Sequence, residues 1–230
     1  MEFRGLIEGN DLFKKSYYKA HEKEFLELAE KGQHPKALFI GCSDSRVIPN
    51  LITRSDPGEL FVVRNVGNFV APFSPSEDFH STASAIEYAV SVLEVKNIIV
   101  CGHTKCGAIE ALYHHDNLDN PNLIHTKKWL TLGDAPKKQA KLALGKDADK
   151  NQLLRLTEKL SVISQIENLL TYPAVKEKVE HGEIMLHGWM YDIVTGDIEY
   201  YNPESMQFES IEVLKNSSFA LKMQQRLSDD

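Results

Sequence analysis

The sequence predicts an α/β fold in which a mainly parallel sheet is flanked by helices. Three short apolar runs, at residues 37–42, 60–63 and 97–101, are typical of buried strands. Residues 79–93, between the second and third runs, carry apolar side chains along one side of a predicted helix. Apolar strands that alternate with helices favour parallel pairing, with the helices covering the faces of the sheet.

The remaining elements extend this pattern toward both ends of the chain. Apolar periodicity predicts four further helices, at residues 14–31, 103–112, 153–170 and 211–227. Residues 184–190 and 198–201 are predicted strands, and the turn at 195–197 between them would add an antiparallel edge to the sheet. The polar segment 116–150 is expected to mix loops with short helices.

Composition limits the possible partners and location. We treat residues 1–230 as a single domain, because no shift in composition marks a boundary. The net charge of -7 argues against a nucleic-acid or anionic membrane partner. The sequence contains no membrane-spanning run and does not open on a signal-peptide pattern, so we expect a cytoplasmic location. Three cysteines, an odd number, make a disulfide framework unexpected.

Two cysteines and a histidine follow predicted strands. Cys42 ends the first apolar run, and His103 and Cys106 come directly after the third. Carboxyl ends of parallel strands meet at one edge of a sheet, and the spacing of His103 and Cys106 places both on one turn. Two thiolates and one imidazole suit zinc in tetrahedral geometry, and three protein ligands leave the open position of a catalytic site.

Ordinary core packing is the alternative to this zinc site. A single His-x-x-Cys pair is a weak signal, and a buried cysteine at a strand end is commonly a core residue. A structural zinc site would need a fourth soft ligand, but Cys101 lies within an apolar run and is expected to be a buried, inert thiol. The spacing alone therefore leaves both interpretations open.

An aspartate and an arginine stand beside the first candidate ligand. Asp44 and Arg46 are two residues apart, so in extended backbone they would point the same way. Arg46 could orient Asp44 through a charge-assisted bond and keep it ionised. Asp44 could then bind the metal or accept a hydrogen bond beside it. A loop salt bridge with a helix-capping aspartate is the simpler alternative.

Together these residues carry a family resemblance. The chain resembles the β-class carbonic anhydrases from about residue 33 to residue 200. The segments that match are CSDSR at 42–46, PGELFVVRNVGN at 57–68, SAIEYAV at 84–90, CGHTKCG at 101–107 and GWMYDI at 188–193.

The resemblance implies a reaction and the residues that perform it. One Zn²⁺ per subunit would be bound by Cys42, His103 and Cys106, with Asp44 and Arg46 as a catalytic dyad. Zinc-bound hydroxide would hydrate carbon dioxide reversibly to bicarbonate and a proton. The implied substrate-binding positions are Gln33, Phe61, Val66, Tyr88 and Gly107, with the apolar members partly supplied by a neighbouring subunit.

The resemblance also implies an assembly and a resting state. The implied sheet has four parallel strands and a C-terminal antiparallel strand, in a homodimer or homotetramer whose helical arm, residues 1–32, packs on a partner subunit. In some members the aspartate matching Asp44 is a fourth zinc ligand in a closed state favoured by bicarbonate. The regulatory positions match Phe39, Arg64 and Tyr191, where Phe39 departs because it lacks the indole N–H of tryptophan.

Two other functions fit the same residues. A hydrolase of carbon disulfide or carbonyl sulfide would use nearly the same zinc chemistry, because these molecules are linear like carbon dioxide. A zinc or bicarbonate-binding protein without turnover would keep the ligands but would not need the Asp44–Arg46 pair.

Overall fold

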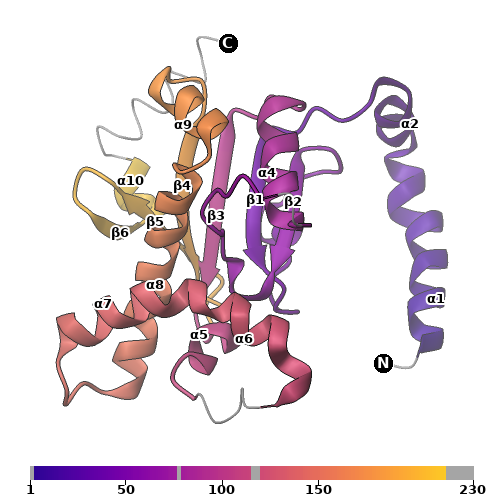
Figure 1. Cartoon of the computed structure of the whole chain (residues 1–230). Coiled ribbons are helices and arrows are strands. Elements are labelled where there is room, and N and C mark those ends of the chain that lie inside the picture. Colours follow the sequence, from indigo (N-terminus) through magenta and orange to yellow (C-terminus); the bar gives the residue numbers. More distant parts are fainter. Residues whose placement is uncertain (1–2, 77–78, 115–119, 216–230) are drawn as a thin grey trace.

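The sheet has six strands in the order β2-β1-β3-β4-β5-β6. The computed structural model describes residues 3–76, 79–114 and 120–215 (Figure 1). The first four strands pair in parallel, and the last two pair antiparallel. The strands are β1 Ala37–Cys42, β2 Leu60–Asn65, β3 Asn97–His103, β4 Met185–Tyr191, β5 Ile198–Asn202 and β6 Gln207–Ser210. The predicted fold class is confirmed, and β6 is an additional strand.

Helices lie before, between and after the strands. The helical elements are α1 Phe3–Phe13, a π-helix Lys14–Tyr18, α2 Glu22–Lys31, α3 Pro49–Thr53, α4 Ser81–Ser91, α5 Gly107–Ala111, α6 Ile124–Leu130, α7 Asp134–Leu144, α8 Lys150–Leu169, α9 Pro173–Glu180 and α10 Ile211–Lys215. Three short 3₁₀ helices complete the described part, at Val66–Asn68, Pro121–Leu123 and Thr131–Gly133. None of the helices in the described part of the chain is long and apolar enough to cross a membrane.

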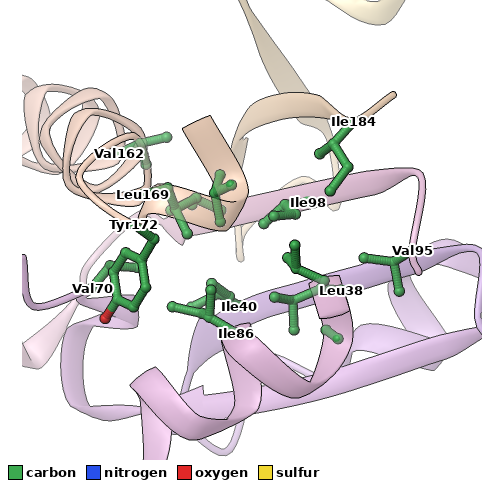
Figure 2. Packing of buried hydrophobic residues seen from close by; sticks show 14 of the residues in the cluster. Leu38, Ile40, Val70, Ile86, Val95, Ile98, Val162, Leu169, Tyr172 and Ile184 are labelled. Carbon is green, nitrogen blue, oxygen red and sulfur yellow. The ribbon is translucent and has the colours of Figure 1, made fainter. Parts of the chain in front are cut away.

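The main core lies between the sheet and the helices α4 and α8. Leu38 and Ile40 of β1 project to this side and are fully buried, and Ile86 of α4 and Val162 of α8 pack into the same cluster (Figure 2). Alternate residues of β1 project to the other side, where Phe39 belongs to a smaller cluster. The parallel strands are apolar on both sides, which explains why their sequences read as continuous apolar runs.

Three predicted helices have different bounds in the structure. The helix predicted over 103–112 begins only at Gly107, because His103 ends β3 and a turn follows it. The helix predicted over 14–31 is a π-helix followed by α2. Of the terminal helix predicted over 211–227, α10 is the described portion, and the remainder lies outside the described residues.

The N-terminal helices differ from the rest of the chain. No residue of α1 or α2 is buried. Figure 1 shows α1 standing apart from the sheet and its helices, on the side of the molecule where β2 is the edge strand. Apolar side chains of α1 are nevertheless exposed, including Phe3 at 77% and Leu12 at 66%. This arm (residues 3–31) has an apolar surface that the described part of the chain leaves uncovered.

Candidate metal centre

Cys42, His103 and Cys106 converge at one edge of the sheet. One candidate ligand atom from each residue lies within 4.8 Å of the others. All three residues are buried, with exposures of 5%, 1% and 3% respectively. We call this cluster the metal centre. Its donor set, two sulfurs and one imidazole nitrogen, is the set expected for zinc.

The sheet topology brings these residues together. The strands β1 and β3 are parallel neighbours, and each ends on a candidate ligand, Cys42 or His103. After β3 the chain turns through Lys105, whose φ of +57° is in the left-handed region that non-glycine residues rarely adopt. That turn carries the backbone to Cys106, immediately before α5. His103 and Cys106 therefore flank a tight turn, whereas the sequence predicted one helical turn.

The hydrogen bonds of His103 leave one ring nitrogen for a cation. Nδ1 donates to the carbonyl oxygen of Thr104 at 3.0 Å, which assigns the lone pair to Nε2. Nε2 is buried and has no hydrogen-bond partner in the described part of the chain. An unpaired buried polar atom costs about 1–3 kcal/mol, and a metal ion bound beside the two sulfurs would remove that cost. The residues present thus fit zinc.

Cys42 and Cys106 shift each other's pKa in opposite directions. The hydrogen bond from Cys106 lowers the pKa of Cys42 to about 4, against the opposing effect of burial. The same hydrogen bond raises the pKa of Cys106, and burial adds to that increase. The lowered pKa favours the thiolate form of Cys42, and a bound cation would favour the thiolate form of Cys106 as well. Cys101 is fully buried and its pKa is raised to about 12 by burial, as expected of an inert thiol.

Asp44 and Arg46 form a two-pronged ion pair beside the metal centre. Arg46 Nε donates to Asp44 Oδ1 at 2.9 Å, and a terminal nitrogen donates to Oδ2 at 2.6 Å. The pair forms across a turn, closed by a bond from the Val47 N–H to the Asp44 carbonyl, and not across extended backbone. The Arg46 hydrogen bond holds the pKa of Asp44 well below its usual range. Asp44 Oδ2 lies 4.0 Å from His103 Nε2, so an ionised acceptor adjoins the centre.

The three predicted regulatory positions lie on three strands of the parallel part of the sheet, with Phe39 on β1, Arg64 on β2 and Tyr191 on β4. Arg64 donates to the carbonyl oxygens of Cys42 at 3.0 Å and Asp44 at 2.6 Å. Phe39 is fully buried, and its ring packs edge-on against Trp189 at 6.1 Å between centroids. Tyr191 pairs with His103 in the β3–β4 register. Arg64 thus supports the loop that carries Asp44, while Phe39 contributes no hydrogen-bond donor.

The five predicted substrate-binding positions are spread around the sheet. The rings of Phe61 and Tyr88 are 5.9 Å apart, and Tyr88 is 45% exposed. Val66 is 44% exposed, and Gly107 begins α5 immediately after Cys106. Gln33 is exposed at the end of the arm, and its side chain makes no hydrogen bond within the described residues. Tyr88 also lines an open groove of about 580 Å³ between α4 and α9, which no residue of the metal centre lines.

Sequence reasoning missed a carboxylate behind the metal centre. Glu158 of α8 is 3% exposed, and its Oε1 accepts from the Cys106 N–H at 3.0 Å and from Arg155 at 2.6 Å. Burial raises the pKa of Glu158 to about 7, although both partners oppose that increase. The available signal was its position, four residues after Leu154 and four before Val162 on the buried side of α8.

Comparison with known proteins agrees with this geometry. A model of the carbonic anhydrase family matches residues 37–198. A carbonic anhydrase of Pseudomonas aeruginosa is 40% identical over 208 residues, which are 90% of this chain and 91% of the relative. The chain belongs to the β-carbonic anhydrase family. Another relative, the carbonic anhydrase of Synechococcus elongatus, is 39% identical over 85% of this chain and 70% of its own length.

Solved β-carbonic anhydrase structures share the fold. The β-carbonic anhydrase CcaA superposes with a TM-score of 0.86 at 36% identity, covering 91% of this chain and all of CcaA (100%). Two tetrameric β-carbonic anhydrases of Sordaria macrospora are represented by a chain with a TM-score of 0.75 and 29% identity, covering 86% of this chain and 95% of that one.

Proposed function

We propose that this chain is a zinc enzyme that reversibly hydrates carbon dioxide to bicarbonate and a proton. The observation that carries the proposal is the metal centre itself, because three soft donors converge while an ionised carboxylate stands at their side. Membership of the β-carbonic anhydrase family supports the same reaction.

The residues at this site have separate roles. When bound, zinc supplies Lewis-acid activation of water. The Asp44 carboxylate is held ionised by Arg46 and would serve as the hydrogen-bond acceptor that orients a water molecule at this site. Arg46 stays charged and keeps both carboxylate oxygens in fixed directions. Cys42 and Cys106 would hold the zinc as thiolates and would supply negative charge at the centre.

The proposed carbon dioxide pocket is apolar. Phe61, Val66 and Tyr88 would form its wall, and Gln33 would present its amide to the substrate. Val66 and Tyr88 are substantially exposed in the single chain, and Gln33 lies at the end of the arm. These positions support a pocket completed by a neighbouring subunit.

Exposed apolar side chains of the arm support a homo-oligomer as part of the proposal. The arm exposes Phe3, Leu6, Ile7 and Leu12, which a partner subunit would cover. We expect the full chain to be a dimer or tetramer by light scattering coupled to size exclusion. A monomer at micromolar concentration would contradict this assembly. A cytoplasmic location is part of the proposal, because a reducing compartment keeps all three free cysteines available as thiols.

Exchange of Asp44 for asparagine tests the proposed function. Asparagine keeps the volume but loses the ionised acceptor, so turnover should fall by roughly 10²–10⁴-fold. The variant should still bind one zinc per chain, because the three ligands remain. Zinc content and stopped-flow hydration of carbon dioxide provide the two measurements, and exposed Asp197→Asn serves as the control.

The same assay separates the competing functions. Wild-type protein that is fully loaded with zinc but hydrates no carbon dioxide would contradict the proposal. Faster turnover of carbon disulfide or carbonyl sulfide in parallel assays would assign the chain to the hydrolase alternative. Zinc binding without turnover of any of the three substrates would indicate a binding protein.

A further inference from the structure

One peptide unit next to the metal centre is held from both sides. The Lys105 carbonyl accepts a hydrogen bond from Arg46 at 3.1 Å. The N–H of the same peptide belongs to Cys106 and donates to Glu158 Oε1 at 3.0 Å. This peptide follows the left-handed φ of Lys105, a conformation that costs energy unless its surroundings hold it.

Glu158 reaches this peptide because α8 lies unusually close to β3. A Cβ built on Gly102 would stand 2.6 Å from a methyl group of Val162. A Cβ built on Gly188 of β4 would stand 3.0 Å from the other methyl group of that valine. Both positions therefore need glycine for α8 to pack against the two strands. The close packing sets the carboxylate behind Cys106, 52 residues earlier in the chain.

The carboxylate occupies a costly position. The Glu158 side chain is 2% exposed, and a buried carboxylate is unfavourable unless polar partners compensate for its lost hydration. Its compensation comes from Arg155 and from the Cys106 N–H, and both bonds end on Oε1. An apolar residue would fill the same space with a smaller loss of hydration free energy. The feature that a carboxylate adds is a strong acceptor fixed beside the backbone of a metal ligand.

We propose that Glu158 is a positioning residue for the metal centre. With Arg46 on the opposite side, it fixes the Lys105–Cys106 peptide and thereby the direction of the Cys106 sulfur toward Cys42 and His103. The proposal rests on the proposed zinc function and deepens it by adding an outer support to one ligand. Outer groups that orient ligands commonly change metal affinity by about 10–100-fold when lost.

Two substitutions separate the reach of this side chain from its charge. Glu158→Asp keeps the charge but is one methylene shorter, so the hydrogen bond to Cys106 is lost. Glu158→Gln loses the charge but keeps the oxygen that accepts both observed bonds. We expect Glu158→Asp to weaken zinc binding by about 10–100-fold, and Glu158→Gln to stay much closer to wild type. Competition with a chromogenic chelator measures the affinity, and exposed Glu167→Asp on the same helix is the control.

Hydrogen exchange at one amide provides a readout independent of activity. The Cys106 N–H should exchange slowly in the wild type and in Glu158→Gln, and much faster in Glu158→Asp. Glu158→Asp with wild-type zinc affinity and a protected Cys106 amide would overturn the proposal. If that variant fails to fold, fast Cys106 exchange in wild-type protein would overturn it equally. Wild-type protein that binds no added zinc would refute the zinc function. If the same protein still protects the Cys106 amide, the hydrogen bond from that amide to Glu158 stands.

Discussion

Two buried histidines on neighbouring strands have opposite surroundings. His103 on β3 and His187 on β4 are 1% and 4% exposed. Both ring nitrogens of His187 are paired, Nδ1 with the Tyr200 hydroxyl and Nε2 with Asn97 Oδ1 at 2.8 Å. Among the residues that the structure describes, His103 Nε2 has no hydrogen-bond partner, and it lies close to the two cysteine sulfurs. Burial therefore does not distinguish a ligand from a core histidine, but an unpaired nitrogen among converging donors does.

The electrostatics of the two histidines follow from the same difference. His187 belongs to a neutral, self-satisfied polar cluster, and burial lowers its pKa to about 4. The ionised Asp44 carboxylate and the Cys42 side chain, whose pKa is lowered, lie beside His103. His187 therefore stays neutral and has a structural role, whereas the surroundings of His103 favour a bound cation. Substitution of each histidine in turn tests whether the two residues have these different roles.

Loss of the metal-facing histidine should have the largest effect. His103→Ala removes the only nitrogen donor of the metal centre, so zinc content should fall to background and hydration activity to below about 1% of wild type. The core around β3 remains, so the secondary structure should persist. Zinc analysis, stopped-flow assay and circular dichroism test this together. A His103→Ala protein that retains one zinc per chain would show that the centre lies elsewhere.

Protonation of His187 should lower the free energy of unfolding in acid. Its pKa is about 4 in the folded chain against 6.5 in an ordinary environment. The unfolded chain therefore binds a proton first, and stability is lost as pH falls from 6.5 toward 4. The loss approaches about 3 kcal/mol at the lower end. Urea unfolding at several pH values should show this slope in the wild type.

A matched pair of variants isolates that contribution. His187→Gln should remove this part of the pH dependence and cost about 1–3 kcal/mol near neutral pH, because its partners lose hydrogen bonds. Exposed His181→Gln should behave as the wild type. Zinc binding should be unchanged in both variants. A pH slope that persists unaltered in His187→Gln would assign the acid sensitivity to other groups.

Local patterns were sufficient for most of the fold. The apolar runs ending at Cys42 and Cys101 predicted β1 and β3, and their parallel pairing follows from buried strands that alternate with helices. The strand β6 was missed because its four residues, Gln207–Ser210, have no apolar run and no alternation with a buried side. The start of α5 was also wrong, since the left-handed turn at Lys105 has no signal in a non-glycine residue.

The parts of the site that could be predicted are those whose residues lie close together in the sequence. Cys42 lies two residues from Asp44, and His103 three from Cys106, so each half is local and strand topology joins them. Glu158 approaches Cys106 across 52 residues through the packing of α8, which no spacing rule describes. The Asp44–Arg46 pair was expected, but its turn geometry depends on hydrogen bonds that only the folded backbone reveals.

Zinc-edge crystallography tests the central claim most directly. Crystals of the full chain, purified without added chelator, would be measured on both sides of the zinc absorption edge. We predict one anomalous peak per chain, bonded to Cys42 Sγ, His103 Nε2 and Cys106 Sγ at about 2.0–2.3 Å. Zinc-replete protein with no peak between these three atoms would contradict the assignment of the metal centre and the reaction built upon it.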